Sequence, residues 1–232
     1  MRTSLWTKLL DLIAPRTCVV CGRRLSAEEA VLCPACMLHL PLTHYAAHPF
    51  DNPLARLFWG QFPIERATAL FFYEPHAELA ELIYSLKYRN RPEVGRQMGR
   101  IAARSLLDEG FFEGIDALVP VPIARRRQRQ RGYNQSREIA CGISEATGIP
   151  IFSKVVERLE FRQSQTRLNP YERRENVEEA FRLTDPGRIA HRHLLLVDDV
   201  ITTGSTINAC ARQLASAPDV RISVFALGYS KS

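Results

Sequence analysis

The sequence predicts an α/β fold in which a doubly wound, mainly parallel sheet follows a small cysteine module. Apolar segments of strand length alternate with segments that carry apolar residues at helical spacing. The segment HLLLVDD, residues 193–199, is apolar on both faces, which is typical of a parallel strand that helices cover on both sides. Four cysteines in two closely spaced pairs lie ahead of this region, within residues 18–36.

The chain has 232 residues, enough for one main domain and a small module. We expect an N-terminal helix and a double zinc-knuckle module over 1–50, and the α/β domain over 55–232. The first segment, MRTSLWTKLLDLIAP, predicts an amphipathic helix that docks on the body, because Lys8 and Asp11 interrupt its apolar run. No apolar run approaches the roughly 20 residues that span a bilayer. A cytoplasmic protein with no membrane span is therefore expected.

The α/β domain is predicted as an alternation of helices and short strands. Four segments have the apolar spacing of a helix face: 76–88, 95–110, 134–148 and 205–216. Three apolar segments predict strands: 115–121, 193–199 and 220–229. An arginine-rich loop, 124–132, is expected after the first of these strands, and Gly148 is placed to end a helix.

Two adjacent carboxylates, Asp198 and Asp199, end the most apolar strand. In open parallel sheets, ligands bind beyond the carboxyl ends of the strands. Carboxylates there can accept hydrogen bonds from the hydroxyls of a ligand or hold the waters of a metal ion. The loop that opens the next helix offers backbone N–H groups and hydroxyls to a phosphate. Its residues are Thr202, Thr203, Gly204, Ser205 and Thr206.

The two carboxylates can accept hydrogen bonds from a diol, and the loop beside them can bind a phosphate. Together they predict a site for a ribose 5-phosphate. Three other interpretations fit parts of the same pattern. The hydroxyl residues are also those of an ordinary helix N-cap, and paired aspartates occur in solvated turns. An acidic pair at a strand end also suits a phosphoacceptor site or a magnesium-dependent phosphatase.

The cysteine module has the spacing C-x2-C-x11-C-x2-C, formed by Cys18, Cys21, Cys33 and Cys36. Four thiolates complete a tetrahedral zinc site with no open position, so the predicted Zn²⁺ is structural. In a cytosolic chain, this spacing favours metal ligands over disulfides. Iron, or knuckles without a metal, are the alternatives. Cys141 and Cys210 lie on apolar helical faces and are expected in the core.

The net charge of +6 is concentrated in the segment ARRRQRQRG, residues 124–132. A local cluster of cations implies an anionic partner. Phosphate, pyrophosphate and nucleic acid all fit this description. A solvated basic face without a partner is the alternative.

Several motifs together resemble a known family. LLLVDDVITTGST, residues 194–206, resembles the PRPP-binding motif of type I phosphoribosyltransferases. The segments VPVPIARRRQRQRGYNQSREIA and RQSQTRLNPYERRENVEEAF, together with the paired cysteines, resemble the competence protein F (ComF) family, which includes GntX-like proteins. The likeness covers nearly the whole chain, with the motifs in the same order.

This resemblance implies a type I phosphoribosyltransferase fold carrying a zinc ribbon. It implies that Asp198 and Asp199 contact the ribose hydroxyls of PRPP and that Thr202–Thr206 hold its 5-phosphate. The implied reaction displaces pyrophosphate from Mg²⁺-bound PRPP, with Asp198, Asp199 and Arg131 as the catalytic residues. Residues assigned to pyrophosphate binding or to a lid are Arg131, Gly132, Asn134, Gln135, Arg158, Gln165, Arg173, Asn176 and Lys87. Helix capping and surface exposure are the alternatives for the lid residues and Lys87.

The acceptor is not specified by these motifs, and neither is the oligomeric state. The aromatic residues near 58–73 are expected in the core, with an acceptor pocket as the alternative. The resemblance also implies a link to competence and to single-stranded DNA. The second hypothesis is therefore a non-catalytic DNA-processing factor that contacts DNA, a helicase or a recombination mediator, with PRPP as an effector or relic ligand. Whether the chain is an enzyme stays open between these two.

Overall fold

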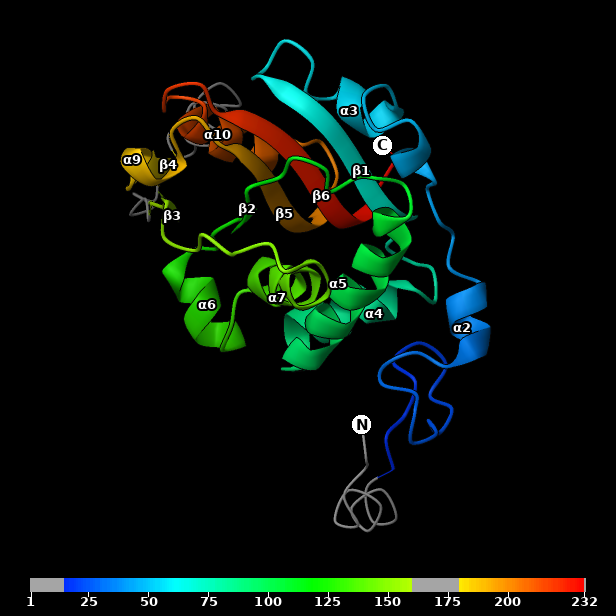
Figure 1. Ribbon diagram of the computed structural model, residues 1–232. Helices are drawn as coiled ribbons and strands as arrows, with labels where there is room; N and C mark the ends of the chain where they lie inside the picture. The colour runs from blue at the N-terminus through cyan, green and yellow to red at the C-terminus, as the bar shows by residue number, and fades with distance from the viewer. Residues whose placement is uncertain (1–14, 160–179, 232) are drawn as a thin grey trace.

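A four-stranded parallel sheet forms the centre of the molecule in the computed structural model, which describes residues 15–159 and 180–231 (Figure 1). Its strands lie in the order β1-β6-β5-β2. Their bounds are Ile64–Phe72 for β1, Arg221–Tyr229 for β6, His193–Ile201 for β5 and Ala117–Pro120 for β2. Strand β5 thus lies between β6 and β2, and its carboxyl end lies between the carboxyl ends of these two parallel strands.

Helices cover both faces of this sheet (Figure 1). One face carries α4 (Ala80–Tyr88), α5 (Pro92–Leu107) and α7 (Gln135–Thr147). The other carries α3 (Pro53–Arg56) and α10 (Ser205–Leu214). The smaller elements are α2 (Pro34–Leu38), η1 (Tyr45–Ala47), α6 (Arg125–Arg131), α9 (Pro186–Ile189), and the antiparallel pair β3 (Val156–Arg158) and β4 (Phe181–Leu183).

The side chains of β5 alternate between two apolar cores. Leu195 and Val197 pack into the core under α5 and α7, whereas Leu194 and Leu196 pack into the core under α10. Successive side chains of a strand point to opposite faces, so a strand covered on both sides must be apolar at every position. The predicted α/β class with a parallel sheet covered on both faces is confirmed.

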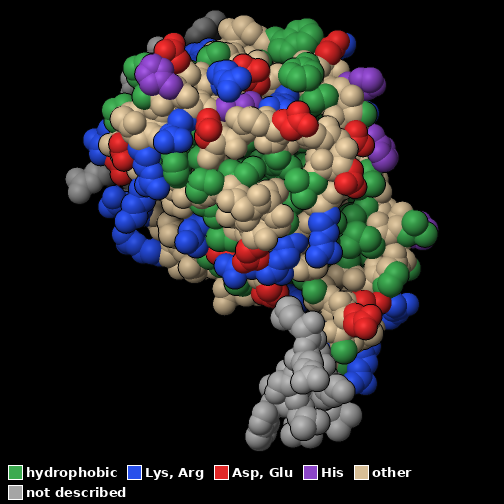
Figure 2. Space-filling model, in the orientation of Figure 1, with side chains coloured by type: hydrophobic (Ala, Val, Ile, Leu, Met, Phe, Trp, Pro, Cys, Tyr) green, Lys and Arg blue, Asp and Glu red, His purple; other side chains and the backbone are tan. Residues whose placement is uncertain are grey.

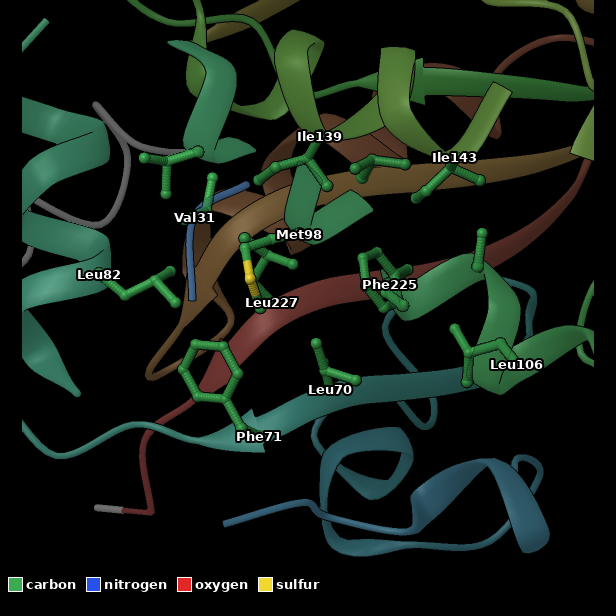
Figure 3. Close-up of a cluster of buried hydrophobic side chains, with 14 of the residues drawn as sticks. Val31, Leu70, Phe71, Leu82, Met98, Leu106, Ile139, Ile143, Phe225 and Leu227 are labelled. Atoms are coloured by element: carbon green, nitrogen blue, oxygen red, sulfur yellow. The ribbon is translucent and has the colours of Figure 1, made fainter. Parts of the chain in front are cut away.

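The cysteine module shares the first of these cores. Val31 of the module is buried together with Leu82 of α4 and Met98 of α5, and Figure 3 shows the three side chains close together. Cys18 and Cys33 belong to the same buried cluster. The module is therefore packed directly against the helices of the α/β region.

Helices α5 and α7 cross at close range. A Cβ atom at Gly142 would lie 1.9 Å from the carbonyl oxygen of Arg96, so α7 can approach α5 only with glycine at this position. The crossing fixes α7 against the sheet and places its first turn near the end of β5. This geometry matters because that turn supplies contacts to the acidic pair.

Most of the elements expected from the sequence are present. The four predicted helices correspond to α4, α5, α7 and α10, and the three predicted strands correspond to β2, β5 and β6. Gly148 ends α7 with a φ of 76°. Of the two cysteines expected in the core, Cys210 is fully buried, whereas Cys141 is only partly buried. The segment expected to form an N-terminal amphipathic helix lies outside the described residues. Within the parts of the chain that the structure describes, no helix is both long enough and apolar enough to cross a membrane.

Two local expectations differ from the structure. The arginine-rich segment is the helix α6 and not a loop, because arginine and glutamine are strong helix formers. Strand β1 was not expected. Of the aromatic residues near it, Phe58 and Phe71 are fully buried in the cores, whereas Trp59 is half-exposed.

Candidate functional site

The two carboxylates at the end of β5 are held by different helices. Ser136 Oγ, from the first turn of α7, donates to Asp198 Oδ1 over 3.0 Å. Lys87 Nζ, from the last turn of α4, lies 3.0 Å from Asp199 Oδ1. Asp199 is buried, and Asp198 keeps part of its surface accessible. The structure therefore brings Lys87 to the acidic pair.

The carboxyl group of Asp198 is easily protonated. Burial raises its pKa to about 7, and the negative charge of Asp199 adds to this effect. The backbone N–H of Asp199, the Ser136 hydroxyl and the charge of Lys87 oppose the increase. Near neutral pH this group can exchange a proton, and its ionised form is the better acceptor for ligand hydroxyls.

The hydroxyl-rich loop follows directly and opens α10. Thr202, Thr203 and Ser205 are exposed, so their hydroxyls are available to a ligand at the start of the helix. Gly204 has a φ of 74°, and a Cβ atom there would lie 2.8 Å from Cε1 of the buried Phe58. Glycine is thus required both by the backbone turn and by the Phe58 ring beneath it.

A cationic cavity of about 360 Å³ lies beside Lys87. Arg131 lines this cavity, and its Nη1 donates to Gln135 Oε1 over 2.9 Å, which fixes the direction of the guanidinium group. The remaining lining residues are Tyr88, Asn90, Arg129, Gln130 and Gly132. Lys87 faces the acidic pair and also lines this cavity, so it connects the two parts of the site.

The predicted pyrophosphate residues divide into two groups. Arg131 and Gly132 line the cavity. Asn134 instead caps α7, where its Oδ1 accepts from the N–H of Ser136 and its Nδ2 donates to the carbonyl oxygen of Val121, each over 3.0 Å. Gln135 is fully buried beneath Arg131. Asn134 and Gln135 thus stabilise the structure around the cavity and do not line it.

One predicted lid residue lies within the described residues. Arg158 is on β3, with its guanidinium carbon 5.2 Å from the ring centroid of Phe181. Burial lowers the pKa of Arg158 and the charge of Arg127 adds to this effect, whereas the charge of Asp198 opposes it. The other predicted lid residues, Gln165, Arg173 and Asn176, lie outside the described residues.

Two residues of the site were not expected from the sequence. Ser136 holds Asp198, as described above. The Tyr133 hydroxyl donates a hydrogen bond of 2.5 Å to the carbonyl oxygen of Leu86, the residue that precedes Lys87. Burial raises the pKa of Tyr133 to about 12. Both lie within GYNQS, the run that contains the predicted Asn134 and Gln135. Their position in that run is the feature of the sequence from which a role in the site could have been inferred.

The four cysteines of the N-terminal module converge on one point. Their sulfur atoms all lie within 4.8 Å of one another, and Cys21 Sγ is 3.7 Å from Cys33 Sγ. Tetrahedral zinc–thiolate geometry requires sulfur atoms roughly 3.8 Å apart. Burial raises the pKa of Cys18, but backbone N–H donors, led by that of Cys21, outweigh it and lower the value to about 6. The donor set therefore fits a soft divalent metal ion.

Comparison with solved structures gives partial similarity to several proteins, of which two follow. Glutamine PRPP amidotransferase from B. subtilis, complexed with ADP and GMP, aligns with a TM-score of 0.42 and 21% identity over 61% of this chain and 30% of that chain. Adenine phosphoribosyltransferase from Leishmania tarentolae aligns with a TM-score of 0.37 and 13% identity over 78% of this chain and 88% of that chain. No protein-family model matches the chain.

Curated relatives align over most of the chain. DNA utilization protein YhgH of Salmonella typhimurium is 30% identical over 213 residues, covering 90% of this chain and 88% of that protein. The YhgH protein of Escherichia coli K12 is 32% identical with the same coverage. Competence protein F of Haemophilus influenzae is 28% identical over 225 residues, covering 90% of this chain and 95% of that protein. The chain therefore belongs to the competence protein F family, together with the YhgH proteins.

Proposed function

We propose that this protein binds Mg²⁺-bound PRPP at the end of β5 and transfers its phosphoribosyl group to an acceptor, with release of pyrophosphate. One observation carries the proposal. Asp198 and Asp199 stand at the carboxyl end of a central parallel strand, are held by Ser136 and Lys87, and precede the hydroxyl-rich start of α10. This is the place where ligands bind in such sheets.

The parts of PRPP match the parts of the site in order. The ribose diol donates to the two carboxylates, and the 5-phosphate accepts from the loop Thr202–Thr206 and the N–H groups at the start of α10. The pyrophosphate extends toward Lys87 and the cavity that Arg131 lines, about 360 Å³ in volume. Arginine suits this role, because its planar group binds phosphate oxygens in pairs.

The chemistry breaks the bond between C1 of the ribose and the pyrophosphate oxygen and forms a bond from C1 to the acceptor. Both electrons of the broken bond leave with pyrophosphate, so negative charge grows there in the transition state. Preplaced cations at Lys87 and Arg131 stabilise that charge and lower the barrier. Mg²⁺, carried in by the substrate, supplies further positive charge at the same oxygens.

The proposal includes a structural zinc ion at the four cysteines. Their sulfur atoms lie within 4.8 Å of one another, and together they would supply the four ligands of a tetrahedral zinc site. Elemental analysis of protein purified without chelator should then find about one zinc per chain.

A second function is favoured by the names of the relatives, which refer to DNA utilization and competence. In this case the chain is a DNA-processing factor, and PRPP is an effector that binds without turnover. The two functions predict the same ligand site and differ in whether pyrophosphate is released.

Calorimetric titration with Mg²⁺-PRPP tests the ligand site. The double variant Asp198→Asn/Asp199→Asn should lose at least about tenfold in affinity, because hydrogen bonds to charged groups contribute about 1.5–3 kcal/mol each. Asp219→Asn is the control, since this exposed carboxylate precedes β6 at the other end of the sheet. Equal affinity in the double variant and the parent would refute the site.

A pyrophosphate-release assay separates the two functions. PRPP is incubated with a panel of nucleophilic acceptors and with single-stranded DNA. Release that requires an acceptor supports transfer, whereas tight PRPP binding without release for any acceptor supports the effector role.

A further inference from the structure

Lys87 is paired with one of the two carboxylates that the ribose diol would use. Its Nζ lies 3.0 Å from Asp199 Oδ1, and the side chains of Lys87 and Asp199 are 23% and 12% exposed. Within residues 15–159 and 180–231, Asp199 is the one ion-pair partner of Lys87. Because Asp199 is nearly buried, the ammonium group and a sugar hydroxyl compete for the same small accessible part of its carboxylate.

Asp198 cannot bind both hydroxyls of the diol in place of Asp199. Its Oδ1 already accepts hydrogen bonds from Ser136 Oγ over 3.0 Å and from the backbone N–H of Asp199 over 2.8 Å. The second oxygen of Asp198 is left for one hydroxyl, so the other hydroxyl needs Asp199. Binding of the full diol therefore depends on where the ammonium group of Lys87 lies.

The side chain of Lys87 has room to change partner while its helix stays in place. The Tyr133 hydroxyl bonds to the carbonyl oxygen of Leu86 and holds the end of α4. The Lys87 side chain borders the cationic cavity of about 360 Å³ and also a second hollow of about 790 Å³ along α4. Lysine has a flexible four-carbon stem, so its ammonium group can leave Asp199 without movement of the backbone.

The charges around the cavity decide which partner the ammonium group prefers. Arg129 and Arg131 line the same cavity, and Arg131 is held by Gln135 over 2.9 Å. Figure 2 shows further Lys and Arg side chains along the edge of the molecule that carries α6, whose sequence RRRQRQR has no acidic residue. These cations repel the ammonium group from the cavity as long as no anion is bound there, and a pyrophosphate reverses the sign of the interaction.

We infer that Lys87 makes binding of the ribose diol conditional on pyrophosphate. Without an anion in the cavity, the ammonium group stays on Asp199 and competes with sugar hydroxyls. Pyrophosphate attracts it into the cavity, which frees Asp199 for the diol. The site thereby selects sugar phosphates that carry a pyrophosphate at C1 against ribose 5-phosphate, which offers the same 5-phosphate and the same diol.

This inference rests on the proposed function and extends it to the release of product. Once the bond from C1 to the pyrophosphate oxygen has broken and pyrophosphate has left, Lys87 returns to Asp199. It then competes with the diol of the phosphoribosyl product, which carries no pyrophosphate. The same ion pair that rejects ribose 5-phosphate thus promotes dissociation of the product.

Calorimetric titration of the parent protein with ribose 5-phosphate tests the inference, with and without saturating pyrophosphate at a constant Mg²⁺ concentration. Pyrophosphate should increase the affinity for ribose 5-phosphate about fivefold, which is the upper range for one ion pair near a surface. Two anions bound side by side repel each other, so a purely electrostatic effect would have the opposite sign. The effect should be reciprocal, with ribose 5-phosphate increasing the affinity for pyrophosphate by the same factor.

Lys87→Met should remove this coupling. Ribose 5-phosphate alone should bind the variant about fivefold more tightly than the parent, because Asp199 has lost its competitor. Arg131→Met is the matched comparison, since Arg131 is a cation of the same cavity whose described contacts are with Gln135 and the ring of Tyr88. It should lower PRPP affinity and leave the affinity for ribose 5-phosphate unchanged.

The outcomes separate this inference from the proposed function. If the parent binds PRPP but Lys87→Met binds ribose 5-phosphate no more tightly, or if the effect of pyrophosphate survives in that variant, the inference is wrong and the ligand site stands. A parent that binds no PRPP would overturn both. If Lys87→Met does not fold, the parent decides, because pyrophosphate that weakens or does not change ribose 5-phosphate binding contradicts the inference.

Discussion

At the scale of single residues, Asp198 combines burial, a neighbouring negative charge and two hydrogen bonds. The first two raise its pKa to about 7, so it differs from an ordinary surface carboxylate. When two carboxylates share one site, one often stays ionised while the other can take a proton. Here Asp199 has the ion pair with Lys87, which leaves Asp198 to respond to pH.

The stability of the fold should depend on this residue in a pH-dependent way. Between about pH 4 and pH 7, folded Asp198 holds a proton that the unfolded chain has lost, so its contribution to the free energy of unfolding falls as pH rises through this window. Asp198→Asn cannot ionise. The stability of the variant relative to the parent should therefore increase by about 1–3 kcal/mol from pH 4 to pH 8. Denaturant unfolding at several pH values measures this, and a constant difference would contradict it.

The acidic pair and the loop after it could be predicted from the sequence because they are contiguous. Ser136 and Tyr133 could not be assigned roles in the same way. Their partners are 62 and 47 positions away along the chain, and no local pattern specifies which residue a hydroxyl will reach. The same reason explains why Asn134 was given a ligand role, although its side chain is used to cap α7.

At the scale of elements, the start of α7 is positioned by its crossing with α5. The helices touch through backbone atoms at Gly142, where a Cβ atom would lie 1.9 Å from the carbonyl oxygen of Arg96 and 2.9 Å from the nitrogen of Arg100. Neither contact involves a flexible side chain, so neither helix can adjust locally. The position of Ser136 beside Asp198 follows from this crossing.

Gly142→Ala should therefore destabilise the protein. Forcing an extra methyl group into a packed site costs about 1–3 kcal/mol, and this exceeds the gain of up to about 1 kcal/mol from the better helix propensity of alanine. Gly187→Ala in α9 is the control, because a Cβ atom there meets nothing within 4 Å. Thermal unfolding should show a lower midpoint for the first variant only. Equal midpoints would mean that the helices separate without cost.

Elements were predictable where the apolar pattern was continuous. Strands β5 and β6 are buried along nearly their whole length, so their sequences are almost uninterrupted apolar runs. Strand β1 carries Glu65 and Arg66 directly after its first residue, both only partly buried, and these charges hid the apolar run that follows. In α6 the high charge favoured a loop, but charge alone does not prevent arginine and glutamine from forming a helix.

At the scale of the whole molecule, the cysteine module and the proposed PRPP site are connected through α4. One end of this connection is the shared core of Val31, Cys18 and Cys33 with Leu82 and Leu86. The other end is Lys87, which follows Leu86 directly and contacts Asp199. Because packed interiors are stiff, a change in the module should move α4 and, with it, the cation at the acidic pair.

Removal of the proposed zinc ion should therefore weaken PRPP binding at the proposed site. Chelation should increase amide hydrogen exchange in α4 and lower the affinity for Mg²⁺-PRPP, while exchange in α10 on the opposite face changes little. Cys33→Ser should reproduce the effect, whereas Cys141→Ser, outside the cluster, should keep both the metal and the affinity. Metal content, exchange and calorimetry on the same samples give the comparison. Faster exchange confined to residues 15–40, with α4 unchanged, would show that the shared core holds α4 without help from the metal.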